Sequence, residues 1–276
     1  MTSIVNISRP RFWIYLFGSY LLGVVAGALS SADFVRFDSI LFGLYFLLPA
    51  NLLVYGVNDI FDFETDRLNP KKAGYEILVQ PEMYRSLWIW IAVLNIPFVI
   101  AAILLTPYAL LSLIPFILLS VFYSASPVRA KEVPLVDSFF NILYVFPGAF
   151  GYQMLTGDFP PLGALIGAGI WTAAMHAYSA IPDIAADRAA GIATVATLLG
   201  RGWTHGFCIA CFTVATLIGI AYQSPAALLG LIYIVLMRFS NESPDADIVR
   251  IYRIFPLLNA FTGFVLFWSI ALPKFF

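Results

Sequence analysis

The chain has 276 residues, of which 61% are hydrophobic and only 11% are charged, with a formal net charge of −1. A soluble domain has about 25% charged residues, so this composition excludes a soluble globule, a disordered chain and a secreted disulfide scaffold. The net charge excludes the basic field that a nucleic-acid-binding protein uses. The sequence therefore predicts an all-α, polytopic membrane protein.

Apolar runs that are long enough to cross a bilayer recur along the whole chain. Since a helical span needs about 20 apolar residues, we expect about nine transmembrane helices. We expect them in one bundle that forms a single domain over residues 1–276. Their expected positions are near residues 12–30, 38–57, 86–105, 107–124, 134–155, 160–181, 204–222, 224–240 and 252–272.

The charged residues predict the orientation in the membrane. Of the 15 Lys and Arg residues, only Arg36 and Lys274 fall on one side of the expected topology. The positive-inside rule then places the amino terminus and the longer loops in the cytoplasm. Of the 16 acidic residues, only Asp33, Asp38 and Asp158 fall on the outer side. We therefore expect the active site at the cytoplasmic ends of the helices.

The first acidic cluster directly follows the second expected span. Asn58, Asp62 and Asp66 are spaced by four residues and share one helical face, with Asp59 close to the same face. Like charges at this spacing repel one another, and ionisable groups near a bilayer are costly and usually functional. This stripe of oxygen ligands indicates a bound cation.

The second acidic cluster ends the sixth expected span. Asp183 and Asp187 form another pair at a spacing of four residues, and Gly191 and Thr194 follow. Carboxylate and amide oxygens are ligands for hard cations, above all Mg²⁺, and the lack of a tight His/Cys set argues against zinc. The pattern predicts Mg²⁺ bound at both clusters.

Basic residues in the same loops extend this prediction to a diphosphate. They are Lys71, Lys72, Arg129, Lys131 and Arg188. Carboxylates that hold Mg²⁺ beside cations that hold phosphate oxygens are typical of a diphosphate site. The simpler interpretation of each cation alone is a topology signal in a cytoplasmic loop.

Two cysteines lie in the seventh apolar run. Cys208 and Cys211 form a C-x-x-C pattern, which can indicate redox chemistry or a metal site. Since the run is apolar and holds no second pair, we expect two small apolar residues on a buried helix.

Three segments together resemble the UbiA superfamily of intramembrane prenyltransferases. Residues 58–66 are similar to its first Asp-rich motif, residues 183–194 to its second, and residues 123–131 to its loop between the fourth and fifth helices. The resemblance covers nearly the whole chain and implies nine helices. One departure is Lys71-Lys72, where the family usually has Arg-Thr, because lysine cannot form a bidentate fork.

The resemblance implies electrophilic prenyl transfer from an allylic diphosphate, with Mg²⁺ as the cofactor and an apolar cavity for the cation. The implied metal ligands are Asn58, Asp62, Asp66, Asp183 and Asp187. The implied catalytic carboxylates are Asp59, Asp62, Asp66, Asp183 and Asp187. The implied diphosphate-binding residues are Asn58, Lys71, Tyr123, Arg129, Lys131 and Arg188.

Residues 55–62, 68–72 and 176–184 further resemble the carotenoid branch, the lycopene elongases, some of which also hydrate their product. This implies dimethylallyl or a longer prenyl diphosphate as donor, lycopene as a hydrophobic acceptor and a carotenoid cyclase as a possible partner. A proton acceptor then has to end the reaction. His176 is a candidate, although we expect it to be a structural histidine bonded across helices.

Three other interpretations stay open. A UbiA-type enzyme can act instead on an aromatic quinone precursor, a chlorophyllide or a lipid acceptor. A cation-coupled transporter also carries intramembrane acids, but near the bilayer midplane, whereas these acids lie at span ends. A non-catalytic partner subunit of a cyclase would not need two intact Asp motifs.

Overall fold

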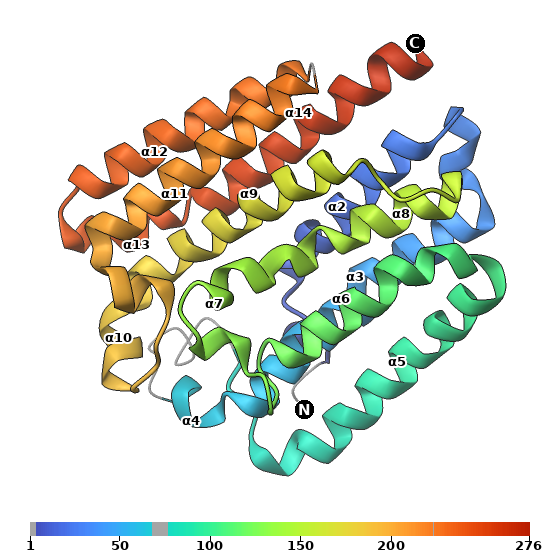
Figure 1. Cartoon of the computed structure of the whole chain (residues 1–276). Helices are drawn as coiled ribbons and strands as arrows, with labels where there is room; N and C mark the ends of the chain where they lie inside the picture. The colour runs from blue at the N-terminus through green and yellow to red at the C-terminus, as the bar shows by residue number, and fades with distance from the viewer. Residues whose placement is uncertain (1–3, 68–76, 223) are drawn as a thin grey trace. The chain divides into compact units, whose positions relative to one another are not determined.

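The computed structural model describes residues 4–67, 77–222 and 224–276, and Figure 1 traces the chain. Helices form 84% of the structure, and no strand occurs in these ranges. The all-helical prediction is confirmed. The chain forms two compact units, one of Met1–Arg129, Phe146–Phe159 and Phe275, the other of Ala130–Val145, Pro160–Lys274 and Phe276.

The first unit consists of α-helices joined by short 3-10 turns. Its α-helices are α1 (Ile4–Ile7), α2 (Trp13–Gly27), α3 (Phe37–Phe61), α4 (Phe63–Asp66), α5 (Tyr84–Leu105), α6 (Leu110–Phe122) and α8 (Phe146–Thr156). Its 3-10 turns are η1 (Pro10–Phe12), η2 (Ser31–Val35), η4 (Pro81–Met83) and η5 (Pro107–Ala109).

The second unit also consists of α-helices joined by short 3-10 turns. Its α-helices are α7 (Val136–Phe139), α9 (Leu162–Ala180), α10 (Ile184–Ala189), α11 (Val195–Ala221), α12 (Gly230–Glu242), α13 (Ile248–Tyr252) and α14 (Phe255–Phe275). Its 3-10 turns are η6 (Ala130–Glu132), η7 (Phe140–Tyr144), η8 (Ile181–Asp183), η9 (Pro225–Leu229) and η10 (Asp245–Asp247).

Each of the predicted apolar runs contains helix, but the helices differ in length. Five are long and apolar enough to cross a membrane in the described part of the chain: Phe37–Phe61, Pro81–Leu105, Leu162–Ala189, Val195–Ala221 and Ile248–Phe275. Pro107–Phe122 is a shorter apolar helix. The count of nine spans and the single domain over residues 1–276 stay predictions.

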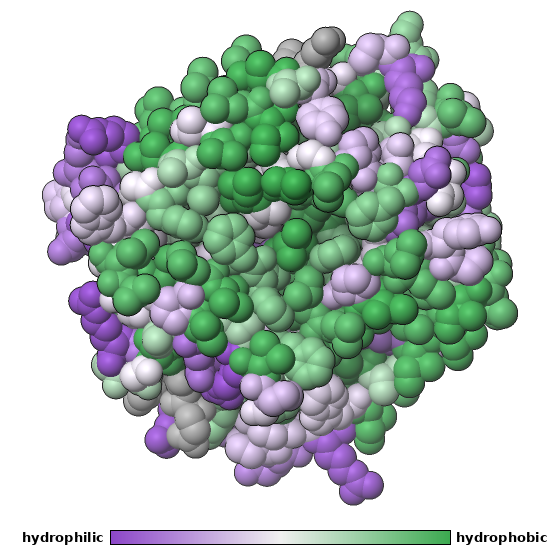
Figure 2. All heavy atoms as spheres, in the orientation of Figure 1, coloured by the Kyte–Doolittle hydropathy of each residue, from purple (hydrophilic) through white to green (hydrophobic). Residues whose placement is uncertain are grey.

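Helix α5 shows why the surface suits lipid. Ile89, Val93, Ile96, Ile100 and Ile103 are each at least half exposed. Their spacing of three and four residues places them on one helical face. Hydrophobic residues also cover most of the face of the molecule in Figure 2. These helices are long and apolar enough for an integral membrane protein.

In the first unit, helices α2 and α8 approach each other through small residues. A Cβ atom on Gly23 would lie 1.8 Å from the carbonyl oxygen of Gly148, and one on Gly151 would lie 2.8 Å from that of Tyr20. Such close backbone contact needs glycine, as in other membrane helix pairs. This contact fixes α2 against α8 within the unit.

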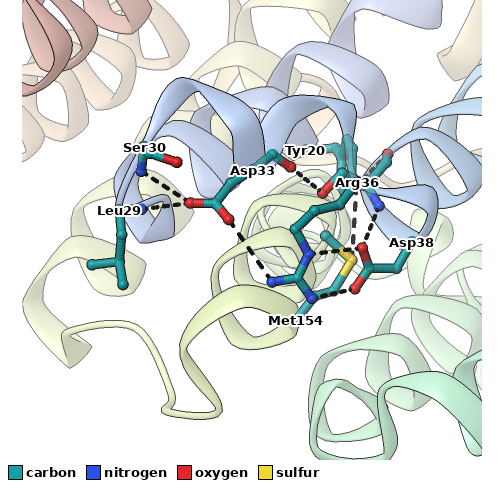
Figure 3. A network of polar contacts seen from close by, with 8 residues as sticks. Tyr20, Leu29, Ser30, Asp33, Arg36, Asp38 and Met154 are labelled. Atoms are coloured by element: carbon teal, nitrogen blue, oxygen red, sulfur yellow. Dashed lines mark hydrogen bonds and ion pairs between the residues drawn. The ribbon is translucent and has the colours of Figure 1, made fainter.

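The start of α3, at the end remote from the first acidic cluster, is held by a surface network (Figure 3). Arg36 donates to both carboxylate oxygens of Asp38, at 3.0 and 2.7 Å. This hydrogen bonding to Asp38 raises the pKa of the Arg36 guanidinium. The Asp33 carboxylate accepts the backbone N–H groups of Leu29 and Ser30 at 2.8 and 3.0 Å. The α2–α3 turn is therefore closed by its own side chains.

In the second unit, polar side chains connect three of the helices. The Tyr178 hydroxyl of α9 donates to Ser240 Oγ of α12 at 3.2 Å. His205 of α11 contacts the same Ser240 Oγ through Nε2 at 3.0 Å. Cys208 and Cys211, also on α11, are free and buried. The prediction that these two cysteines are buried helix residues is confirmed.

Candidate functional site

The first acidic cluster lies where α3 ends. Asp62 leaves helical geometry, with φ −110° and ψ 8°, and the short helix α4 follows. The predicted spacing survives this break, because Asp66 N–H donates to the Asp62 carbonyl at 2.8 Å. Asp59 and Asp62 are almost fully buried, at 3% and 4% exposure. Two carboxylates are thus buried within one helical turn.

A polar contact joins this cluster to the loop after α6. The Asn58 amide Nδ2 donates to Asp62 Oδ2 at 2.5 Å and to Ser124 Oγ at 3.0 Å. Arg129 Nη1 donates to the Phe61 carbonyl at 3.4 Å. Tyr123, which precedes Ser124, is half-buried. The first unit therefore brings Asn58, Asp62 and Ser124 into contact and places Arg129 at the carbonyl of Phe61, and Ser124 is not among the predicted residues.

Asp59 has a partner that the sequence analysis missed. Arg9 Nη2 lies 2.8 Å from Asp59 Oδ1, and the two side chains are 15% and 3% exposed. The Arg9 guanidinium also stacks over the Tyr55 ring, 4.7 Å from its centroid. A cavity of about 260 Å³ adjoins this pair and is lined by Arg11 among others. No periodicity connects residues 9 and 59, so the pattern alone could not have found this ion pair.

The second acidic cluster belongs to the second unit. Pro182 ends α9, the turn η8 carries Asp183, and α10 carries Asp187 in its first turn. Both carboxylates are partly exposed. The loop then turns at Gly191, whose φ of 72° favours glycine. Thr194 follows it and caps α11. The two carboxylates thus stand at a helix break, as Asp62 does.

Two further predicted phosphate ligands, Arg188 and Lys131, belong to the second unit. Arg188 is exposed and donates through Nη2 to the Thr197 carbonyl at 3.0 Å. Lys131 is buried on η6, at 9% exposure. Lys71 and Lys72 lie outside the described residues.

A buried carboxylate on α7 is a further feature that the motifs do not include. Asp137 is fully buried, and its Oδ2 accepts the Val195 N–H at 2.9 Å. The same oxygen lies 3.6 Å from His176 Nε2. The expected cross-helix partner of His176 is therefore present. The signal that could have found it is an acidic residue inside a predicted apolar span.

The oxygen donors of both clusters fit Mg²⁺. A protein-bound Mg²⁺ typically uses one or two carboxylates and completes its shell with waters and substrate phosphate oxygens. The Asn58–Asp62 contact offers such a donor pair, as Asp183 and Asp187 do in the second unit. Across the described ranges, no group of three or more His, Cys, Asp or Glu is arranged to hold a metal ion.

Comparison with known proteins decides the family. The UbiA prenyltransferase family matches residues 16–243. The chain belongs to the UbiA prenyltransferase family. It is therefore a prenyltransferase enzyme.

Individual members of the family resemble the chain over nearly its full length. The lycopene elongase/hydratase of Haloferax volcanii is 38% identical over 270 residues, covering 94% of this chain and 85% of that protein. A UbiA homologue from Archaeoglobus fulgidus, solved with GPP and Mg²⁺, superposes with a TM-score of 0.72 at 18% identity, covering 96% and 99% of the chains. The same homologue solved with DMAPP and Mg²⁺ gives a TM-score of 0.69 at 17% identity, with the same coverage. These structures confirm the UbiA fold.

Proposed function

We propose that this enzyme transfers a prenyl group, dimethylallyl in the first instance, from its diphosphate to a carotenoid hydrocarbon such as lycopene, with Mg²⁺ as cofactor. The observation that carries the diphosphate chemistry is the contact of Asn58 with Asp62 and Ser124, next to Arg129. It places metal-type oxygen donors beside a guanidinium within one unit. The acceptor class is supported by the name and the 38% identity of the Haloferax relative.

Each cluster has a defined part in the proposal. Asn58, Asp62, Asp66, Asp183 and Asp187 hold Mg²⁺. Tyr123, Arg129, Lys131, Arg188 and Lys71 hold the diphosphate oxygens. Bound Mg²⁺ neutralises the negative charge of the departing diphosphate. Asp59 has a supporting part, because it holds Arg9 beside the motif.

The residues of the chain then have three tasks. The basic side chains orient the allylic diphosphate so that its C–O bond faces the acceptor. The aromatic and aliphatic side chains exclude water from the allylic cation, and aromatic faces attract it. A group of the protein or the diphosphate itself accepts the proton that the product cation loses.

The small number of buried cations favours a hydrocarbon acceptor over an anionic one. An aromatic acid, chlorophyllide or phospholipid precursor carries an anionic group that needs a cation in the apolar cavity. Among the described residues, Lys131 is the most buried Lys or Arg, and the proposal assigns it to the diphosphate, while Arg9 is paired with Asp59. The anionic acceptors are therefore the weaker alternative, and the prenyltransferase family argues against a transporter.

The membrane arrangement is part of the same proposal. We place the amino terminus and both Asp clusters on the cytoplasmic side, with nine spans. A carotenoid cyclase remains a candidate partner, since cyclisation acts on the ends of an elongated carotenoid.

Expression in lycopene-producing bacteria tests the proposal. Mass spectrometry should detect a carotenoid heavier by one or two isoprenyl units, with or without added water. Asp62→Ala and Asp183→Ala should abolish this product while the protein still inserts into the membrane. Unchanged lycopene with a membrane-inserted wild type would contradict the carotenoid acceptor, and wild-type turnover in either variant would contradict the metal role.

A further inference from the structure

The buried carboxylate of Asp137 joins three elements of the second unit. Its Oδ2 accepts the backbone N–H of Val195, the first residue of α11, at 2.9 Å. The same atom lies 3.6 Å from Nε2 of His176 on α9. The Asp137 side chain itself belongs to α7 and has 0% exposure. One carboxylate therefore links α7, α9 and α11.

This carboxylate is costly where it lies. Its other oxygen, Oδ1, is also buried and accepts no hydrogen bond from the residues that the structure describes. A neutral asparagine oxygen could accept the Val195 N–H as well, with a smaller desolvation penalty. Holding α11 therefore needs an acceptor oxygen here but not a carboxyl group. The carboxyl group has a further effect where it meets His176, because an acid beside one ring nitrogen fixes the orientation and the tautomer of the imidazole.

The position of the pair connects it to the second acidic cluster. His176 precedes Asp183 by seven residues on the same helical path, which is about 10 Å along the axis. Val195 directly follows Thr194, the last residue of the second motif. Asp137 thus contacts the residue that follows the second motif, and His176 lies on the helix that precedes it. The imidazole is 17% exposed, so it is not sealed within the protein.

We propose that His176 accepts the proton in the step that ends the reaction, and that Asp137 is the residue that positions its imidazole. This inference rests on the proposed function. In the transfer, the allylic C–O bond breaks and the diphosphate leaves with the electron pair. The acceptor double bond supplies the pair for the new C–C bond, which leaves a tertiary cation on the acceptor.

Either ending of that cation releases one proton to His176. In the first, a C–H bond beside the cation breaks, its electrons form a C=C bond, and the imidazole takes the proton. In the second, a water oxygen forms a C–O bond to the cation, and the imidazole takes the proton that the water loses. The imidazolium beside Asp137 returns its proton to solvent when the product leaves.

The test uses full-length enzyme in nanodiscs with lycopene, dimethylallyl diphosphate and Mg²⁺. His176→Gln should lower kcat by about 10²-fold, which is typical for loss of a general base. It should leave KM for dimethylallyl diphosphate within about twofold, and it should shift the ratio of alkene to hydrated product. Asp137→Asn keeps an acceptor for Val195 N–H but loses the charge, so it should shift the same ratio in the same direction.

Two comparisons separate this role from a structural one. Ser138→Ala is the matched control, because Ser138 is the fully buried neighbour on α7 and its hydroxyl makes no hydrogen bond among the described residues. It should match the wild type in kcat and in product ratio. The double variant of Asp137 and His176 should be no slower than His176→Gln alone, because the two residues act as one unit.

Several outcomes would overturn the inference. Wild-type kcat and product ratio in His176→Gln would exclude the proton transfer. Wild-type behaviour of Asp137→Asn would reduce Asp137 to an anchor for α11. If His176→Gln fails to fold, the ratio of alkene to hydrated product in Asp137→Asn is the test, and a wild-type ratio there would contradict the inference. If the wild-type enzyme does not elongate lycopene, the proposed function is contradicted. If the wild type elongates lycopene and the variants match its kcat and product ratio, only this inference is contradicted.

Discussion

The Arg9–Asp59 ion pair gives a prediction whose size follows from the structure. The two groups lie 2.8 Å apart and are 15% and 3% exposed, so removal of one partner takes this ion pair away from a largely buried charge. Such a loss costs about 3–5 kcal/mol. Asp59→Ala should fall at the lower end, because the partly exposed Arg9 can turn towards water. Arg9→Ala should fall at the upper end, since Asp59 stays buried.

The contact of Arg9 with an aromatic ring adds to the expected effect of Arg9→Ala. The Arg9 guanidinium lies over Tyr55, a contact that contributes about 0.5–2 kcal/mol. Arg9→Ala should therefore remove both the ion pair and the ring contact.

Equilibrium unfolding in mixed detergent micelles measures these changes through a double-mutant cycle. The coupling energy between Arg9 and Asp59 should be about 1–3 kcal/mol. The matched control is the exposed Arg238–Glu242 pair, whose side chains are 70% and 61% exposed and whose coupling should be about 0.3–0.5 kcal/mol. A coupling for Arg9 and Asp59 no larger than in this control would refute the argument.

Three further predictions concern packing, diphosphate binding and topology. Gly23→Ala should destabilise the protein by about 1–3 kcal/mol, measured by thermal unfolding, because its Cβ would overlap the Gly148 carbonyl; an unchanged midpoint would contradict the α2–α8 contact. Arg129→Ala should raise KM for the allylic diphosphate more than KM for the acceptor, and equal effects would make the loop structural. A membrane-impermeant maleimide should label Asp158→Cys in intact cells but Arg238→Cys only after lysis, and the opposite result would reverse the predicted orientation.

The sequence predicts the helices best where one apolar run is long. The expected span at 86–105 is the 22-residue helix α5, which continues through Pro97, because transmembrane helices tolerate an internal proline. The expected span at 134–155 instead becomes α7, the turn η7 and α8. Pro147 favours the first turn of a new helix over the interior of an old one, and α8 begins at Phe146.

Helix ends depend on polar contacts that hydropathy does not include. The expected span at 204–222 lies in the part of α11 that follows a break at Gly200, where φ is 72° and ψ is 171°. The part before the break begins at Val195, because Thr194 and Thr197 form a reciprocal cap. Just after the break, Arg201 donates to the carbonyls of Ser240 and Asn241. These bonds connect residues about 40 positions apart, so no local pattern reveals them.

In the candidate site, local spacing predicts some of the contacts, and the others join distant segments. Spacing alone predicts that Asn58 and Asp62 share a face, and their side chains touch. Spacing cannot predict that Arg9 binds Asp59 or that Asp137 meets His176, because each pair joins distant segments. The motifs therefore indicate the chemistry. The charged partners of the buried side chains, Arg9 and Asp137, are brought close only by the tertiary fold.

The most direct test of the central claim is the stoichiometry of the reaction in a purified system. Enzyme in nanodiscs with lycopene, isotope-labelled dimethylallyl diphosphate and Mg²⁺ should release one diphosphate for each labelled isoprenyl unit found in the carotenoid by mass spectrometry. Chelation of Mg²⁺ should stop both signals together. Labelled carotenoid without diphosphate release, undiminished turnover after chelation, or no labelled carotenoid from a folded enzyme would contradict the account.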